Sequence, residues 1–260
     1  MSETPVTTAR PDTAYWASRL RRAALSAAGP LTTPVGSIIS VRTKAPQVVV
    51  TFDDGPEPGS TERVLSALRD HRATATFFVL LTRAERSPRL LAEVVAAGHE
   101  VGFHGFDHRR LTRLPAARVR IELAVGAARL ADLLGSPVRW FRPPHGAQTP
   151  RVWRAAREAG LWSVLWGPCA WDWLPRPVEE LSALAMRGMR PGAILLAHDG
   201  LAGPDDGDEG DDCSSPPPRF DRGELVGRLL TGMAQRGLTG RSLSAVLAAG
   251  RPRLVPWFRR

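Results

Sequence analysis

Cysteine is scarce in this 260-residue chain, which has only Cys169 and Cys213. Two cysteines so placed indicate neither a disulfide framework nor a zinc knuckle, so a reducing compartment is compatible with the sequence. No stretch approaches the roughly 20 apolar residues that a membrane-spanning helix needs. The apolar stretch at 23–29 is short and ends at Pro30, unlike a secretory signal. We therefore predict a cytoplasmic protein.

Lysine is nearly absent as well, because Lys44 is the only one and every other basic side chain is arginine. The formal net charge of +9 and the isoelectric point near 11.1 would suit a nucleic acid or an anionic membrane. The basic residues are spread along the whole chain without an aromatic and basic platform, so we predict no nucleic-acid partner. At 12–28, Trp16 lies among arginines in an amphipathic pattern, which predicts a helix that packs on the fold or makes a peripheral membrane contact.

The chain has 43% hydrophobic and 23% charged residues, which is typical of a globular protein. Strand and helix patterns alternate from Gln47 onward, which indicates parallel strands joined by crossover helices. The expected strands are 37–42, 47–52, 74–80, 99–103, 138–141, 161–166, 193–198 and 238–242. The expected helices are 60–70, 87–97, 115–134, 150–159, 176–189, 222–235 and 243–249.

These repeats predict an α/β barrel as a single domain of 46–260, preceded by a helical N-terminal extension of 1–45. A doubly wound open sheet fits the same alternation. Polar residues, however, cluster at many strand ends rather than at one switch point, which is typical of barrels. The segment 201–221 is dense in Asp, Gly and Pro, and we interpret it as either a lid or a solvated insertion.

Two neighbouring carboxylates, Asp53 and Asp54, lie where the first strong strand pattern ends, in the run TFDDGP at 51–56. Since side chains alternate along an extended chain, the two carboxylates point in different directions. One can face a metal ion while the other takes a proton from water. Alone, the run would be an ordinary turn, because Asp, Gly and Pro are the usual turn residues.

Two histidines, His104 and His108, follow the expected strand 99–103 in the run HGFDH. Alone, such a pair would be interpreted as capping or surface residues. With one of the aspartates it makes a set of two imidazoles and one carboxylate, which leaves coordination positions for water and substrate.

Three further strand ends carry polar groups, in the runs RPPHG at 142–146, WDW at 171–173 and LLAHD at 195–199. They supply a basic residue that can orient a carboxylate, a carboxylate that can orient a histidine, and a histidine at the end of a buried strand. Together these groups form an acid and base set.

With these motifs the sequence resembles the polysaccharide deacetylases, carbohydrate esterase family four, over roughly 46–245. The pairing of TFDDGP with H-x-x-x-H is highly specific. The resemblance implies a distorted (β/α) barrel of seven or eight strands and hydrolysis of N-acetyl or O-acetyl groups. It also implies one divalent metal ion held by Asp54, His104 and His108, with zinc expected first and cobalt, nickel or manganese as alternatives.

The resemblance implies roles for further residues. Asp53 would be the catalytic base, oriented by Arg142, and His198, held by Asp172, would protonate the leaving amine. Trp173 and Leu196 would line the acetyl pocket, and the backbone N–H of His145 would stabilise the oxyanion.

The sequence departs from the family's usual pattern at three positions. His145 stands where a tyrosine is usual, Gly105 where a serine or threonine is usual, and Cys169 where an acidic residue is frequent. We expect the metal site to form with one outer hydrogen bond fewer, and the substrate contact at position 145 to differ.

We therefore predict a metal-dependent hydrolase that removes an N-acetyl or related acyl group from an amino sugar, a glycolipid or an oligosaccharide. A family member that binds a glycan without turnover and a deacylase of a non-sugar amide are the alternatives. In the cytoplasm the enzyme would not meet mature wall polymer, so we expect a building block, glycolipid or secondary-metabolite intermediate. The sequence does not predict the oligomeric state.

Overall fold

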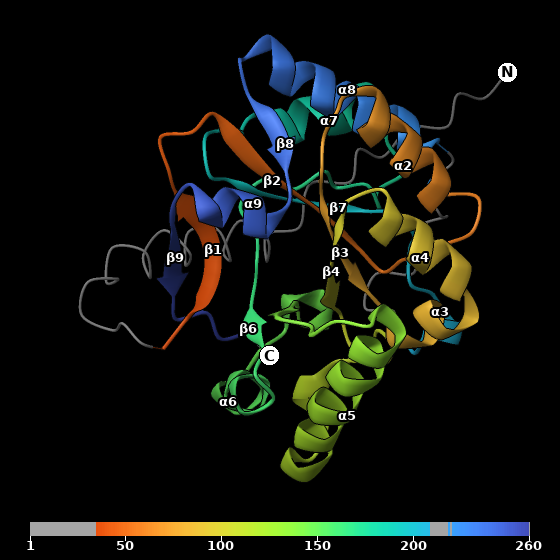
Figure 1. The fold of residues 1–260 in the computed structure, drawn as a ribbon, viewed down its shortest axis with the longest axis vertical. Coiled ribbons are helices and arrows are strands. Elements are labelled where there is room, and N and C mark those ends of the chain that lie inside the picture. The colour runs from red at the N-terminus through yellow and green to blue at the C-terminus, as the bar shows by residue number, and fades with distance from the viewer. Residues whose placement is uncertain (1–34, 209–217, 219, 260) are drawn as a thin grey trace, which may run out of the picture.

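The computed structural model describes residues 35–208, 218 and 220–259. The helix expected at 12–28 and the acidic stretch at 209–217 lie outside the described residues. In the described part, helices surround a curled sheet of short strands, and strands far apart in the sequence lie side by side (Figure 1). The expected distorted α/β barrel is confirmed.

All the expected strands are present, and most are shorter than expected. They are β1 (Ser37–Arg42), β2 (Gln47–Asp53), β3 (Thr76–Val79), β4 (Glu100–Phe103), β5 (Trp140–Phe141), β6 (Trp162–Ser163), β7 (Ile194–His198) and β8 (Thr239–Arg241). Seven of them form one parallel sheet in the order β6-β5-β4-β3-β2-β7, with β8 also paired to β2. Because β2 lies between β3 and β7, the residues that follow its last residue lie at the barrel mouth between the ends of these two strands.

The expected helices are also present, and each ends within a few residues of its predicted limit. They are α2 (Thr61–Asp70), α4 (Pro88–Ala96), α5 (Ala116–Leu134), α6 (Pro150–Glu158), α7 (Val178–Met186), α8 (Arg222–Gln235) and α9 (Leu243–Ala248). Gly135 follows α5 with a left-handed φ of 63°, a conformation that costs glycine little and that ends the helix.

Alternate side chains of β2 belong to two different apolar clusters. Val48, Val50 and Phe52 belong to the large cluster that the sheet forms with its covering helices. Val49 belongs to a second cluster inside the barrel, where α9 and β1 also contribute side chains. Asp53 continues the inward series of Val49, so its carboxylate points into the barrel.

β1 belongs to the part of the chain that we assigned to the N-terminal extension, yet it forms part of the barrel wall. It pairs antiparallel with β9 (Arg251–Val255), a strand that the sequence patterns did not predict. Single bridges join Ile38 to Val164, next to β6, and Ser40 to Ala193, next to β7. β1 thus lies between β6 and β7, where the seven-stranded sheet does not close on itself.

One helix was also missed, α3 (Leu81–Arg86), because it directly follows a strand and has too few residues to show helical periodicity. Across the described ranges, no helix is both long enough and apolar enough to cross a membrane.

Candidate active site

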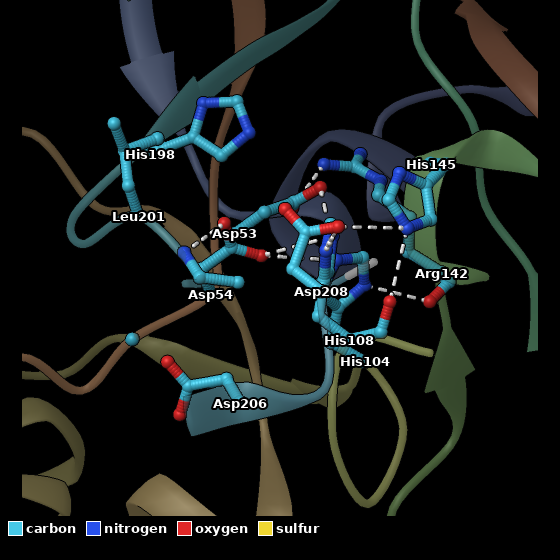
Figure 2. A network of polar contacts seen from close by, with 12 residues as sticks. Asp53, Asp54, His104, His108, Arg142, His145, His198, Leu201, Asp206 and Asp208 are labelled. Carbon is cyan, nitrogen blue, oxygen red and sulfur yellow. Dashed lines mark hydrogen bonds and ion pairs between the residues drawn. The ribbon is translucent and has the colours of Figure 1, made fainter. Parts of the chain in front are cut away.

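The carboxyl ends of the strands bring the polar residues of the separate motifs together. Asp53 is in register with His198 across the pair of β2 and β7. His104 directly follows β4, and Arg142 directly follows β5. Figure 2 shows these side chains converging on one point from four strands.

The two adjacent carboxylates have different main partners, although both approach His104 Nε2, Asp53 Oδ2 at 3.8 Å and Asp54 Oδ1 at 3.3 Å. Asp53 Oδ1 accepts a hydrogen bond of 2.6 Å from Arg142 Nη1. Asp54 has a left-handed φ of 74°, which is uncommon for a residue with a side chain, and its Oδ1 faces His104 and His108 (Figure 2). Such backbone strain persists where the surrounding structure enforces it, and it is frequent at functional sites.

Asp54, His104 and His108 form a compact group of candidate metal ligands. Asp54 Oδ1 lies 3.3 Å from His104 Nε2 and 3.5 Å from His108 Nε2. This oxygen is buried and has no hydrogen-bond partner among the described residues. Burial raises the pKa of Asp54, but the nearby histidines, His108 foremost, outweigh it and hold that pKa well below its usual value. An ionised carboxylate oxygen without a donor, beside two imidazole nitrogens, fits a divalent cation.

The tautomer of His104 suits a metal ligand. Its Nδ1 lies 2.7 Å from the backbone oxygen of Arg142, which can only accept, so Nδ1 carries the proton. Nε2 therefore presents its lone pair toward Asp54.

Arg142 is fully buried beneath the site. Besides Asp53, its Nη1 donates to Thr51 Oγ1 at 2.8 Å, and its Nε donates to the backbone oxygen of Val164 at 3.3 Å. The guanidinium also lies 4.2 Å from the centre of the Phe78 ring. These contacts fix the orientation of the Asp53 carboxylate.

A second carboxylate, Asp172, holds His198. Asp172 Oδ1 lies 2.7 Å from His198 Nδ1, and Oδ2 accepts from the backbone N–H of His198 at 2.8 Å. Burial lowers the pKa of His198, but Asp172 outweighs it, with smaller contributions from Asp54 and Asp53, and raises that pKa to about 9. His198 is therefore a protonated acid in the metal-free protein at neutral pH.

The three residues expected to contact substrate lie around this centre. The Trp173 ring meets the His198 ring edge to face, with centroids 5.5 Å apart. Leu196 is buried on β7 and, two residues before His198, points to the same side of the strand. His145 has a left-handed φ of 57°, and its ring packs against His108 with centroids 4.2 Å apart.

The start of the acidic segment packs on the candidate ligands. The backbone N–H of Ala202 donates to Asp54 Oδ2 at 3.0 Å. Asp206 is 4% exposed and forms ion pairs with Arg83 at 2.5 Å and Arg86 at 2.8 Å. The interpretation of this segment as a solvated insertion is therefore wrong at Asp206, which is buried beside the candidate ligands, and the lid interpretation stays a prediction.

The comparisons with known proteins agree with this geometry. A family model for polysaccharide deacetylases matches residues 40–164. A chitooligosaccharide deacetylase of Sinorhizobium fredii is 36% identical over 204 residues, which cover 77% of this chain and 92% of that protein. The chain belongs to the polysaccharide deacetylase family.

A second curated relative supports this assignment, and a solved structure shares the fold. A peptidoglycan-N-acetylglucosamine deacetylase of Bacillus cereus is 34% identical to this polysaccharide deacetylase over 158 residues, 59% of this chain and 72% of that protein. The solved structure of a carbohydrate esterase family 4 pseudoenzyme from Bacillus anthracis has a TM-score of 0.71 at 23% identity, covering 86% of this chain and 72% of that chain. At this identity the similarity shows the fold alone.

The sequence patterns missed two buried ionisable residues beside the His198 and Asp172 pair of this polysaccharide deacetylase, Arg222 and Asp199. Arg222, the first residue of α8, donates to Asp172 Oδ2 at 2.8 Å and to the backbone oxygen of His198 at 3.2 Å. Asp199 accepts from Thr61 Oγ1 at 2.6 Å and from the Gly55 N–H at 3.2 Å, and burial raises its pKa to about 7. Asp199 follows His198 in the run LLAHD, so its position at the end of a buried strand could have identified it from the sequence.

Gly105, one of the three departures from the family pattern, has a φ of 119°. A Cβ atom there would lie 2.8 Å from the backbone oxygen of Asp107. The loop between the two histidines thus has a conformation that requires glycine. It lacks the side-chain hydrogen bond that a serine or threonine at this position would make.

Proposed function

We propose that this polysaccharide deacetylase hydrolyses the N-acetyl group of an amino sugar in an oligosaccharide, a glycolipid or a related glycan, with one divalent metal ion. The observation that carries the proposal is the buried Asp54 Oδ1, which has no donor among the residues that the structure describes and faces two imidazole nitrogens, next to Asp53 and His198. The barrel mouth thus holds a candidate base, a candidate acid and a set of candidate metal ligands, which are the groups that metal-dependent hydrolysis of an amide needs.

Asp54, His104 and His108 would hold the ion. Zinc is the first candidate, because two imidazoles and one carboxylate are a frequent zinc ligand set; cobalt, nickel and manganese are the alternatives. When bound, the ion acts as a Lewis acid toward the acetyl carbonyl and the attacking water.

Asp53 is the proposed base. Its Oδ1 is held by Arg142, and its Oδ2 is directed toward the ligand group, 3.8 Å from His104 Nε2. A water that approaches the substrate carbonyl from this side meets a carboxylate oriented to accept its proton. The backbone N–H of His145 is the proposed donor to the oxyanion.

His198 is the proposed acid. Asp172 occupies Nδ1, so Nε2 is the nitrogen that delivers a proton to the leaving amine. Arg222 donates to the same Asp172 carboxylate, and His198 first and Arg222 second lower the pKa of Asp172 against the effect of burial. Trp173 and Leu196 are the proposed walls of the acetyl pocket.

We expect the purified protein to release acetate from one or more members of a panel of N-acetylated amino sugars, chitooligosaccharides and glycolipids. Removal of the metal ion by a chelator should abolish acetate release, because the Lewis acid that the proposed reaction needs is then missing. Addition of zinc or cobalt should restore acetate release. Acetate and bound metal are measured on the same preparation. A protein that retains glycans but releases no acetate with any metal would be a non-catalytic binder, and release from non-sugar amides alone would overturn the sugar substrate.

The dependence of the activity on pH should reflect the protonation of His198. Only its protonated form can donate, so activity should fall as the pH rises through its pKa. Asp172→Asn removes the negative charge that raises this pKa, and the alkaline limb should therefore move to lower pH. In the metal-loaded enzyme the limb should lie below the value of about 9, since the cation offsets the effect of Asp54 on His198.

Rate profiles of wild type, Asp172→Asn and Arg222→Gln over the alkaline range test this assignment. Arg222→Gln is the control, because it also removes a contact of the Asp172 carboxylate but keeps the negative charge beside His198. The loss of a cation there should not lower the pKa of His198. An alkaline limb that stays in place in Asp172→Asn would contradict the role of His198. The cytoplasmic location and the peripheral membrane contact stay predictions that cell fractionation can check.

A further inference from the structure

His108 presents a different nitrogen to each of two groups of side chains. Its Nε2 faces Asp54 at 3.5 Å, whereas its Nδ1 faces Asp208 Oδ1 at 3.6 Å (Figure 2). This Nδ1 is buried and has no hydrogen-bond partner within the described part of the chain. The matching nitrogen of His104 has one, the backbone oxygen of Arg142. The two histidines therefore differ in how their outer nitrogens are supported.

The chemistry of a neutral imidazole decides what Nδ1 needs. If Nε2 gives its lone pair to a metal ion, Nδ1 carries the proton and requires an acceptor. Metal-ligating histidines usually donate this proton to a carboxylate, a backbone oxygen or water, which fixes the ring and makes the ligating nitrogen more basic. The Asp208 carboxylate lies slightly beyond hydrogen-bond distance, so a small rotation of either side chain brings it into contact.

We infer that Asp208 is a positioning residue for the metal site: its carboxylate accepts the Nδ1 proton of His108 and thereby orients Nε2 toward the ion. The inference rests on the proposed metal site. On this inference, the loop after β7 supplies the outer carboxylate for His108 Nδ1, which has no other hydrogen-bond partner in the described residues.

The loop is anchored in a way that places Asp208 reproducibly. The backbone N–H of His108 donates to the backbone oxygen of Asp206 at 2.7 Å, so the two segments are joined two residues before Asp208. The Asp206 side chain is held by Arg83 and Arg86, and Arg83 also donates to the backbone oxygen of Leu201 at 2.8 Å. The loop is thus held in place at Asp206, and only Gly207 separates this residue from Asp208.

His145 borders the same carboxylate. Its Nε2 lies 3.6 Å from Asp208 Oδ1 and donates to the backbone oxygen of His108 at 3.0 Å. Since the oxygen of His108 can only accept, Nε2 of His145 carries a proton and offers no lone pair to a cation. These contacts favour an outer carboxylate at Asp208 over a second metal site built from His108, His145 and Asp208.

The test is zinc affinity of the metal-free full-length protein, measured by competition with a chromophoric chelator, for wild type, Asp208→Asn and Asp208→Ala. Loss of an outer partner usually weakens metal binding by about 10 to 100-fold, and we expect Asp208→Ala in that range. Asp208→Asn keeps an acceptor oxygen without the charge, so its affinity should lie between the other two. The absorption spectrum of the cobalt-loaded forms gives a second readout, because reorientation of His108 changes the ligand field.

Asp205→Ala is the matched control, since Asp205 is exposed in the same loop and should bind zinc as wild type does. Equal affinities of the Asp205 and Asp208 variants, with equal cobalt spectra, would overturn the inference. A wild type that binds two zinc ions and loses one in Asp208→Ala would replace it by a second cation site. A wild type that binds no metal would overturn the proposed function itself, which is a different result.

Discussion

Asp53→Asn is expected to lower turnover by about 10² to 10⁴-fold, the usual contribution of a positioned base, while the bound metal stays in place. The amide keeps the shape of the carboxylate and can still accept from Arg142 Nη1, which lies 2.6 Å from Asp53 Oδ1. It cannot take a proton from water. Activity and metal content should therefore separate in this variant.

The opposite result is expected when a ligand is replaced. Asp54→Ala and His104→Ala should each lose the metal and the activity together, because each removes one of three candidate ligands. Metal content and acetate release are measured on the same preparations as for Asp53→Asn. If Asp53→Asn lost the metal and Asp54→Ala retained it, the assignment of the two carboxylates would be reversed.

The sequence predicted the parts of this molecule that follow from local pattern. The apolar pattern before Asp53 and Asp54 predicted that both carboxylates lie at the end of a buried strand, and β2 ends at Asp53. Because parallel strands present their carboxyl ends at one edge, motifs more than 100 residues apart, such as 51–56 and 195–199, could be expected to meet. Both predictions depend only on periodicity and strand direction.

The misses depend on partners that periodicity does not reveal. Arg222 is one arginine among many, and only the packing of α8 against Asp172 distinguishes it. Asp206 is one of several acidic residues in a segment that looks solvated, and its burial requires both Arg83 and Arg86. A buried charge is stable only with its counter-charge, so neither partner could be recognised alone.

Arg142→Met is expected to lower the free energy of unfolding of the metal-free protein by about 3 to 5 kcal/mol, the usual cost of removing one partner of a buried ion pair. Arg142 is fully buried, and its guanidinium donates to Asp53, Thr51 and the barrel backbone. Methionine fills most of the volume, but it leaves the Asp53 carboxylate without its cation inside the barrel.

The double variant Asp53→Asn with Arg142→Met separates this charge effect from lost packing. Removing the carboxylate removes the uncompensated charge, so the double variant should be more stable than Arg142→Met alone. Urea unfolding of wild type, both single variants and the double variant gives the coupling energy. Arg228→Met is the control, because its ion pair with Glu224 is exposed, with 45% of the Arg228 side chain accessible, and should contribute less than about 1 kcal/mol. Equal losses in Arg142→Met and Arg228→Met, or a double variant no more stable than Arg142→Met, would mean that the buried pair does not hold Asp53 in the way its geometry indicates.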